Sequence, residues 1–154
     1  GWSSIIIGST AGTGAMAVNA ITWDDPLTLR SSTGVITIAG IQSMGANDLT
    51  VQTSGDPVIS AALTGSGVLT IQPTAVNTTI GLAGGAGTLN LSAAELTQIT
   101  DGWSSIIVGS TAGTGAMAVN AKTWSDPLTL RSNTGVITLA GAQAMGANDL
   151  NIQT

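Results

Sequence analysis

Residues 27–52 read LTLRSSTGVITIAGIQSMGANDLTVQ, and this stretch opens and closes on the same four-residue pattern. LTLR and LTVQ each place aliphatic side chains first and third, and polar side chains second and fourth. This alternation has the period of a β-strand that buries one face. Between them lies a second apolar run, GVITIAG, bounded by turn-forming Ser, Thr and Gly. The stretch therefore predicts one coil built from two strands and two turns.

The tetrad recurs along the whole chain. Positions one and three are aliphatic in every copy, and successive copies start 22, 22, 20, 20, 17, 22 and 22 residues apart. Units of this length are too short for a helical repeat, and no stretch sustains a period of 3.6 residues. We therefore predict an all-β fold, a parallel β-helix (β-solenoid) with about 20 residues per coil and every tetrad stacked on one face. The eight copies are residues 5–8, 27–30, 49–52, 69–72, 89–92, 106–109, 128–131 and 150–153.

A longer repeat contains the shorter one. Residues 1–53 and 102–154 align without a gap at an offset of 101 and differ at only nine positions. We interpret residues 1–154 as a single continuous solenoid, in which 1–101 form one full long repeat and 102–154 the first half of the next. Five tetrad steps span the long repeat, so this interpretation expects five coils per 101 residues.

One segment departs from the strand pattern. Residues 91–99, LSAAELTQI, contain good helix formers and a Ser92-x-x-Glu95 capping box. In that motif the two side chains satisfy each other's free backbone N–H groups at a helix start. One short helical turn is therefore expected in each long repeat.

The composition excludes several classes of function. There are 3 Lys and Arg against 8 Asp and Glu, giving a net charge of −5, and His, Cys, Phe and Tyr are absent. Three cations cannot neutralise a phosphate track, so a nucleic-acid partner is not expected. Disulfides and the common zinc and redox motifs need residues that the chain lacks. The apolar runs are too short to span a bilayer. We expect no enzyme activity, no cofactor and no metal.

Carboxylates are the only catalytic groups left to consider. Asp24 and Asp25 in WDDP are the one adjacent pair, and the second copy reads WSDP, with Ser125 and Asp126. Because one partner is lost in a near-identical repeat, we interpret these residues as turn caps before proline. Four further carboxylates stand alone in turns and lack a calcium-binding motif, so turn roles are expected for them as well. They are Asp48, Asp56, Asp101 and Asp149.

Two glycine-rich pieces, GSTAGTG and GLAGGAG, superficially suggest a phosphate-binding loop. Both lack the lysine and the strand-to-helix context that such a loop requires. Coil corners are the preferred interpretation. The column of Thr at the second tetrad position is similarly reminiscent of ice-binding solenoids, but it is single and interrupted by Asn and Ile. An ordinary solvent-facing row is expected there.

The four Trp residues form two equivalent pairs, Trp2 with Trp103 and Trp23 with Trp124. Trp stacks on sugars and anchors protein interfaces, and it also covers hydrophobic corners. Structural packing is favoured for all of them. If the chain contacts a partner, these are the candidate contact residues.

Residues 88–117, TLNLSAAELTQITDGWSSIIVGSTAGTGAM, resemble the long repeats of large haemagglutinin-like surface proteins, relatives of filamentous haemagglutinin. The resemblance extends over essentially the whole chain, and AELTQITDGWSSI is its most specific stretch. It implies a right-handed parallel β-helix and secretion. It further implies a structural role in an extracellular filamentous adhesin or surface fibre, with no catalytic residues. Two alternatives stay open: a subunit of a sheath or S-layer-like coat, and a carbohydrate-active β-helix of the lyase or hydrolase type.

The expected partners are further repeats of the same chain, or other copies that associate end to end or laterally, together with cell-surface glycans. Neither end of the chain has a recognisable capping element, and exposed strand edges favour pairing. Five coils at the usual strand spacing predict an axial repeat of about 24 Å.

Overall fold

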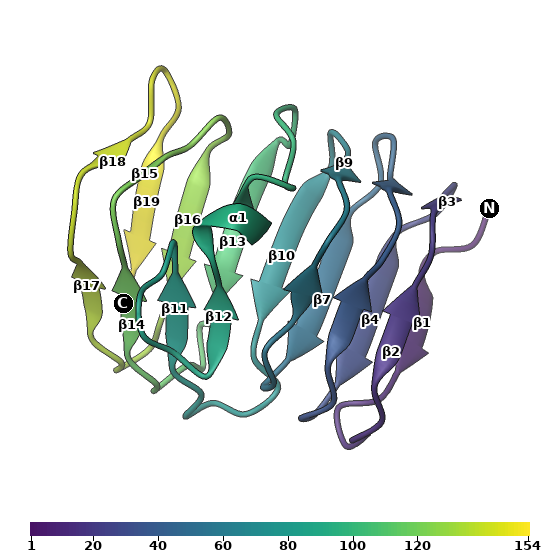
Figure 1. Ribbon diagram of the computed structural model, residues 1–154, viewed down its shortest axis with the longest axis horizontal. Helices are drawn as coiled ribbons and strands as arrows, with labels where there is room; N and C mark the ends of the chain where they lie inside the picture. The colour runs from purple at the N-terminus through teal and green to yellow at the C-terminus, as the bar shows by residue number, and fades with distance from the viewer.

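The computed structural model describes residues 1–154, and it shows the chain wound into a parallel β-solenoid (Figure 1). A single seven-stranded parallel sheet runs along its whole length and forms the first face. The alternating tetrads predict these strands, because one aliphatic row turns inward and the polar row outward. The strands are β1 (Ile5–Gly8), β4 (Leu27–Ser31), β7 (Leu49–Thr53), β10 (Val68–Gln72), β13 (Ser105–Gly109), β16 (Leu128–Arg131) and β19 (Leu150–Gln153).

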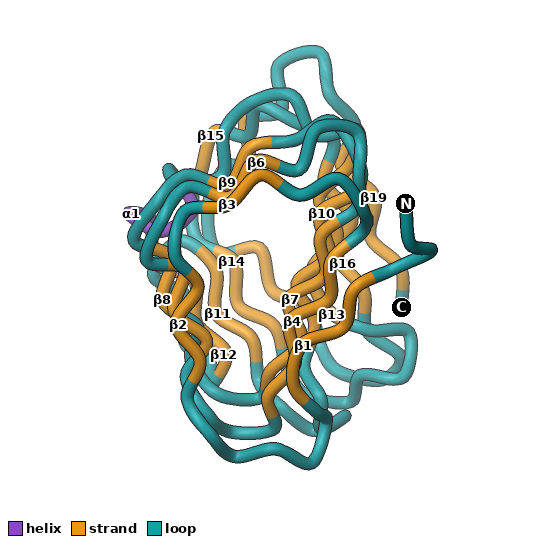
Figure 2. Tube along the Cα trace, turned by 90° about the vertical axis from the view of Figure 1, so that its right-hand side faces the viewer, coloured by secondary structure: helices purple, strands orange, loops and turns teal.

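Two narrower faces close the cross-section, as Figure 2 shows in a view down the long axis of the solenoid. The second face holds a three-stranded sheet, β2 (Met16–Val18), β5 (Ile36–Ile38) and β8 (Val58–Ile59), and a four-stranded sheet, β12 (Leu89–Leu91), β11 (Ile80–Leu82), β14 (Met117–Val119) and β17 (Ile137–Leu139). The third face holds β3 (Ile21–Thr22), β6 (Gln42–Ser43) and β9 (Leu63–Thr64), then β15 (Lys122–Thr123) and β18 (Gln143–Ala144).

The core is a set of aliphatic rows. On the first face Leu27 pairs with Leu49, Leu49 with Leu69, and Leu69 with Ile106, so that like residues stack from coil to coil. The central members of this row are between 0 and 3% exposed. Burial of each such side chain contributes about 1.5–3 kcal/mol to folding. The solenoid is therefore stabilised by repetition of one small packing unit.

The expectation of five coils per long repeat is wrong, because the structure has four. Leu69 pairs directly with Ile106, so the segment between them forms one long coil. The tetrad at residues 89–92 does not join the first face with the other seven. Its strand β12 lies on the second face and pairs with β11. Alternation reports that one side of a strand is buried, but it does not report which face the strand belongs to.

A tight double pass of the chain produces the extra strand. β11 and β12 are parallel neighbours whose paired residues, Ile80 and Leu89, are only nine positions apart. The return loop between them needs close backbone approach, since a Cβ atom on Gly81 would overlap the Gly85 carbonyl oxygen. Ala83, in the same loop, has a φ of 55°. The glycine-rich residues 81–87 thus form a strand and its return loop, where the sequence suggested a simple corner.

The predicted helical turn is present as α1 (Ala93–Leu96), with both halves of the capping box formed. It lies where the second face is interrupted, and it packs against both β8 and β12. Two carboxylates replace ladder hydrogen bonds at this break. Glu95 Oε1 accepts from the Ile59 N–H at 3.2 Å, and Asp56 Oδ1 accepts from the Asn90 N–H at 3.1 Å.

Candidate functional site

All the Trp residues lie on one edge of the solenoid, at the corner that leads into the first face. Trp103 and Trp124 are 2% and 4% exposed, Trp23 is half-buried, and Trp2 is 72% exposed. The two members of the pair Trp2 and Trp103 therefore differ completely in burial, although they stand in nearly identical sequences. Of the predicted contact residues, Trp2 alone presents most of its ring to solvent.

Trp103 is buried in a gap left by a glycine. A Cβ atom added to Gly65 would lie 2.8 Å from Cη2 of the indole ring and 3.1 Å from the Met44 Cβ. The indole N–H points to the Leu63 carbonyl at 3.4 Å. β9 pairs with β6 so that Gly65 follows Thr64 as Met44 follows Ser43. The indole ring of Trp103 thus fills the space that is left because Gly65 has no side chain.

The aspartates before proline in WDDP and WSDP, Asp25 and Asp126, each bond to the corner of the preceding coil. Asp126 Oδ1 accepts from the Gly102 N–H at 2.8 Å, and Asp25 Oδ1 accepts from the Trp2 N–H at 2.7 Å. Asp24 and its counterpart Ser125 are exposed. The carboxylate present in both copies, Asp25 or Asp126, therefore joins its corner to the corner before it. The residue that differs between the copies, Asp24 or Ser125, takes no part in this contact.

Burial raises the pKa of Asp126. The Gly102 N–H opposes this shift, because a donor to a carboxylate favours its charged form, and the nearby charge of Asp101 adds to it. Desolvation likewise raises the pKa of Asp56, with the Asn90 N–H opposing and the Glu95 charge adding. Both carboxylates are structural acceptors in contact with backbone N–H groups.

A glutamine accepts the indole hydrogen bond of each of Trp23 and Trp124, and sequence reasoning did not find it. Gln42 Oε1 accepts from the Trp23 indole N–H at 2.8 Å, while its Nε2 donates to the Asn19 and Gly40 carbonyls at 2.8 and 2.6 Å. Gln143 repeats all three bonds around Trp124. The available signal was a Gln placed 19 residues after a Trp in both copies.

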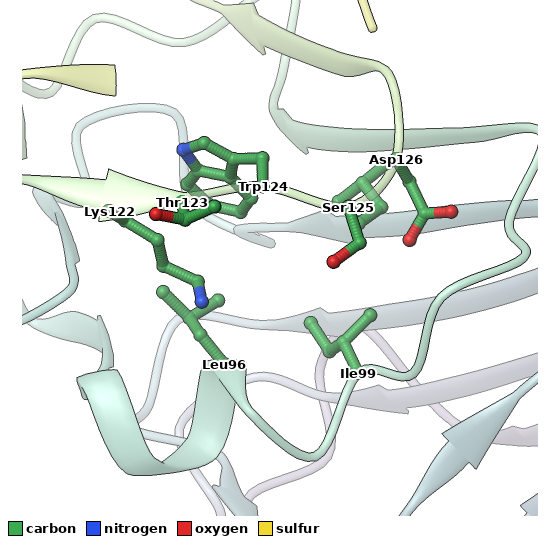
Figure 3. A pocket seen from close by; sticks show the side chains of 8 residues that line it. Leu96, Ile99, Lys122, Thr123, Trp124, Ser125 and Asp126 are labelled. Atoms are coloured by element: carbon green, nitrogen blue, oxygen red, sulfur yellow. The ribbon is translucent and has the colours of Figure 1, made fainter. Parts of the chain in front are cut away.

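A small cavity lies beside α1, where Figure 3 shows Lys122 and Trp124 facing Leu96 and Ile99. The Lys122 ammonium lies 5.5 Å from the centre of the Trp124 ring. Desolvation lowers the pKa of Lys122. The cavity has a volume of about 30 Å³, which admits a water molecule but not a substrate of ordinary size.

The outer surface has wider but shallow hollows. One of about 420 Å³ lies over the second face, lined by Thr79, Thr88 and Thr138 together with small residues. No group of three or more Asp, Glu, His or Cys side chains is close enough to hold a metal ion. Asp48, one of the isolated turn carboxylates, accepts from the Val68 N–H of the next coil at 2.7 Å.

The outward threonine row is interrupted as the sequence suggests. Thr28, Thr50 and Thr70 are stacked in register, and the next member of the row is Ile107. Thr129 and Asn151 continue it beyond this break. The row is therefore a mixed polar and aliphatic surface on a single sheet.

These features define the chain as a parallel β-solenoid repeat protein. Comparison with family models, with curated proteins and with solved structures found no match. The only helix is four residues long, and no helix has the length and apolar character needed to cross a bilayer.

Proposed function

We propose that this chain is a structural repeat segment of an extracellular filamentous adhesin or surface fibre, in which it provides length, rigidity and attachment. One observation carries the proposal. The boundary between the two long repeats, after Asp101, falls inside the uninterrupted seven-stranded sheet, where β10 pairs with β13 in the same register as every other neighbour. Repeats joined in this way extend a rod without a hinge.

Rigidity follows from the way the coils are connected. Parallel strands on the first face bond each coil to the next, and shorter sheets on the other two faces bond the coils on either side of the break at α1. Side-chain bridges add to these, such as Arg30 Nε donating to Gln52 Oε1 at 3.0 Å and Arg131 Nε donating to Gln153 Oε1 at 2.7 Å. Bending the rod would have to stretch one of these ladders.

The variation of the outward surface between the two copies supports a role in attachment. The resemblance to haemagglutinin-like repeats is the basis for the extracellular assignment. Within the two copies, two of the most marked chemical changes lie on or next to the third face, where Ile21 becomes Lys122 and Ile41 becomes Ala142. A face that varies while the core rows repeat is suited to contacts with glycans or other surface molecules.

Length measurement tests the proposal. Four coils at the usual strand spacing give an axial rise of about 19 Å per 101 residues. Arrays of two, four and six long repeats, imaged by electron microscopy, should be unbranched rods whose length grows by about 19 Å for each added repeat. Flat sheets would favour the sheath or coat, and globular particles would contradict both. Release of reducing ends from a panel of polysaccharides would instead support the carbohydrate-active alternative.

A further inference from the structure

Equivalent residues of the two long repeats have unequal environments at the start of each repeat. Trp2 is 72% exposed and Trp103 is 2% exposed, while Ile7 is 38% exposed and its counterpart Val108 is fully buried. Ile5 and Met16 are also only half-buried, whereas Ile106 and Met117 are buried. The residues of the second set are covered because another coil precedes them.

The preceding part of the solenoid is built from residues 54–101, and its contacts are specific. β10 pairs with β13 along the first face. The Gly67 carbonyl accepts from both the N–H and the hydroxyl of Ser104, at 3.0 and 2.9 Å. Gly65 leaves the gap that the Trp103 ring occupies. Residues 54–101 therefore form a surface that is complementary to residues 102–109.

Residues 1–8 reproduce residues 102–109 with one difference, Ile7 in place of Val108. Residues 1–8 therefore contain the Trp, the two Ser and the aliphatic row that contact this complementary surface. We infer that the surface formed by Trp2, Ser3, Ile5 and Ile7 is a docking site for another copy of residues 54–101, with Trp2 as its anchor. The inference rests on the proposed function as a repeat of an end-to-end array and names the partner of that array.

The Trp also discriminates between coils. The position of Gly65 is taken by Met44 in the coil before it, and by Met145 in the last coil of the chain. A methionine side chain would occupy the space that the indole ring needs. Direct stacking of the coil that carries Met145 on Trp2 of another molecule therefore leaves no space for the ring, and only residues 54–101, with Gly65, complete the junction. The fit of the Trp ring into the space at Gly65 thus determines the order of the coils.

The experiment extends the chain by residues 54–101 placed before Gly1, so that Asp101 precedes Gly1 as it precedes Gly102. The added segment contains no Trp, so any change in Trp fluorescence reports on the original four. We expect the acrylamide-accessible fraction, about one Trp in four, to fall towards zero and the emission to shift to the blue. Amide exchange of residues 5–8 should slow by about tenfold or more.

Two matched extensions serve as controls. The same extension with Gly65→Leu in the added copy should leave Trp2 accessible, because the leucine fills the gap. The same extension with Gly65→Met in the added copy, which places there the residue type of Met44, should also leave it accessible. Burial of Trp2 by either control would overturn the inference that the glycine gap selects the partner.

An accessible Trp2 in the first extension would overturn the inference altogether, including the case in which the added segment stays unfolded while residues 106–131 keep their protection. This result is separable from the test of function. A buried Trp2 in arrays that form no rods would reject the fibre and keep the junction. Rods in which Trp2 stays accessible would support the fibre and reject the junction.

Discussion

Gln42 lies fully buried beneath Trp23 and accepts the hydrogen bond of its indole N–H at 2.8 Å. The same amide donates to two backbone carbonyls, so one side chain satisfies three polar groups, two in the coil before it and one in its own. Such a network is a strong constraint on the corner, because any partner left unpaired in the interior is costly.

Replacement of this glutamine by an apolar residue of similar size should therefore be destabilising. We expect Gln42→Leu to lower the free energy of unfolding by about 1–3 kcal/mol, since it leaves buried donors and acceptors unsatisfied. Gln143 makes the same bonds but is half-exposed, so water can replace some of them in Gln143→Leu. Urea denaturation of both variants gives the comparison. Equal losses would show that burial does not decide the cost.

The gap at Gly65 yields a second prediction. Gly65→Leu should displace the Trp103 ring and lower the free energy of unfolding by about 1–3 kcal/mol, the usual cost of overpacking. Gly14→Leu is the control, because a Cβ atom at Gly14 meets nothing within 4 Å. Denaturant midpoints and Trp emission measure the effect. A shift in Gly14→Leu as large as that in Gly65→Leu would remove the role assigned to the gap.

The raised pKa of Asp126 predicts a dependence of stability on pH. Because the folded state holds this proton more tightly than the unfolded chain, Asp126 favours folding below its unfolded pKa of about 3.9 and loses that contribution as pH rises through the folded pKa. Asp126→Asn keeps an oxygen acceptor for the Gly102 N–H but has no charge to desolvate. Its stability relative to the native chain should therefore increase from pH 4 to pH 7. Parallel stability curves for the two proteins over this range would contradict the assignment.

Glu95 has two tasks at the break in the second face. Its Oε2 accepts from the Ser92 N–H at 3.0 Å, and its Oε1 accepts from the Ile59 N–H at 3.2 Å. Ser92→Ala should cost about 1 kcal/mol through loss of the helix cap. Glu95→Ala should cost more and should also speed amide exchange at Ile59, because that N–H loses its acceptor. Unchanged exchange at Ile59 in Glu95→Ala would show that the carboxylate does not join the two sheets.

Several features of the structure could be predicted from the local sequence. The alternating tetrads predict strands with one buried face, and seven of the eight lie on one sheet. The capping box predicts α1, because Ser92 and Glu95 satisfy each other's backbone groups without help from the rest of the chain. The second strand β5 lies within the apolar run GVITIAG that the sequence marks. These are properties of a few neighbouring residues.

The third face was not predicted, and its residues explain why. Ile21–Thr22 and Gln42–Ser43 are strands of two residues, too short to show any alternation. They form strands because the neighbouring coils hold matching backbone groups beside them. The role of Gln42 depends in the same way on Trp23, which belongs to the coil before it.

Period-two burial repeated at coil spacing is enough to predict a parallel β-solenoid, since few other folds satisfy that pattern. The face that each strand joins, and the residues of the repeat that are covered, depend instead on contacts between coils. Leu89 and Leu69 stand in similar tetrads, yet the return loop at Gly81 and Gly85 places Leu89 on the second face. Trp2 and Trp103 stand in the same local sequence, yet one is exposed and the other buried. In both cases a side chain of the solenoid is buried by the coil stacked against it, and that coil lies far away along the chain.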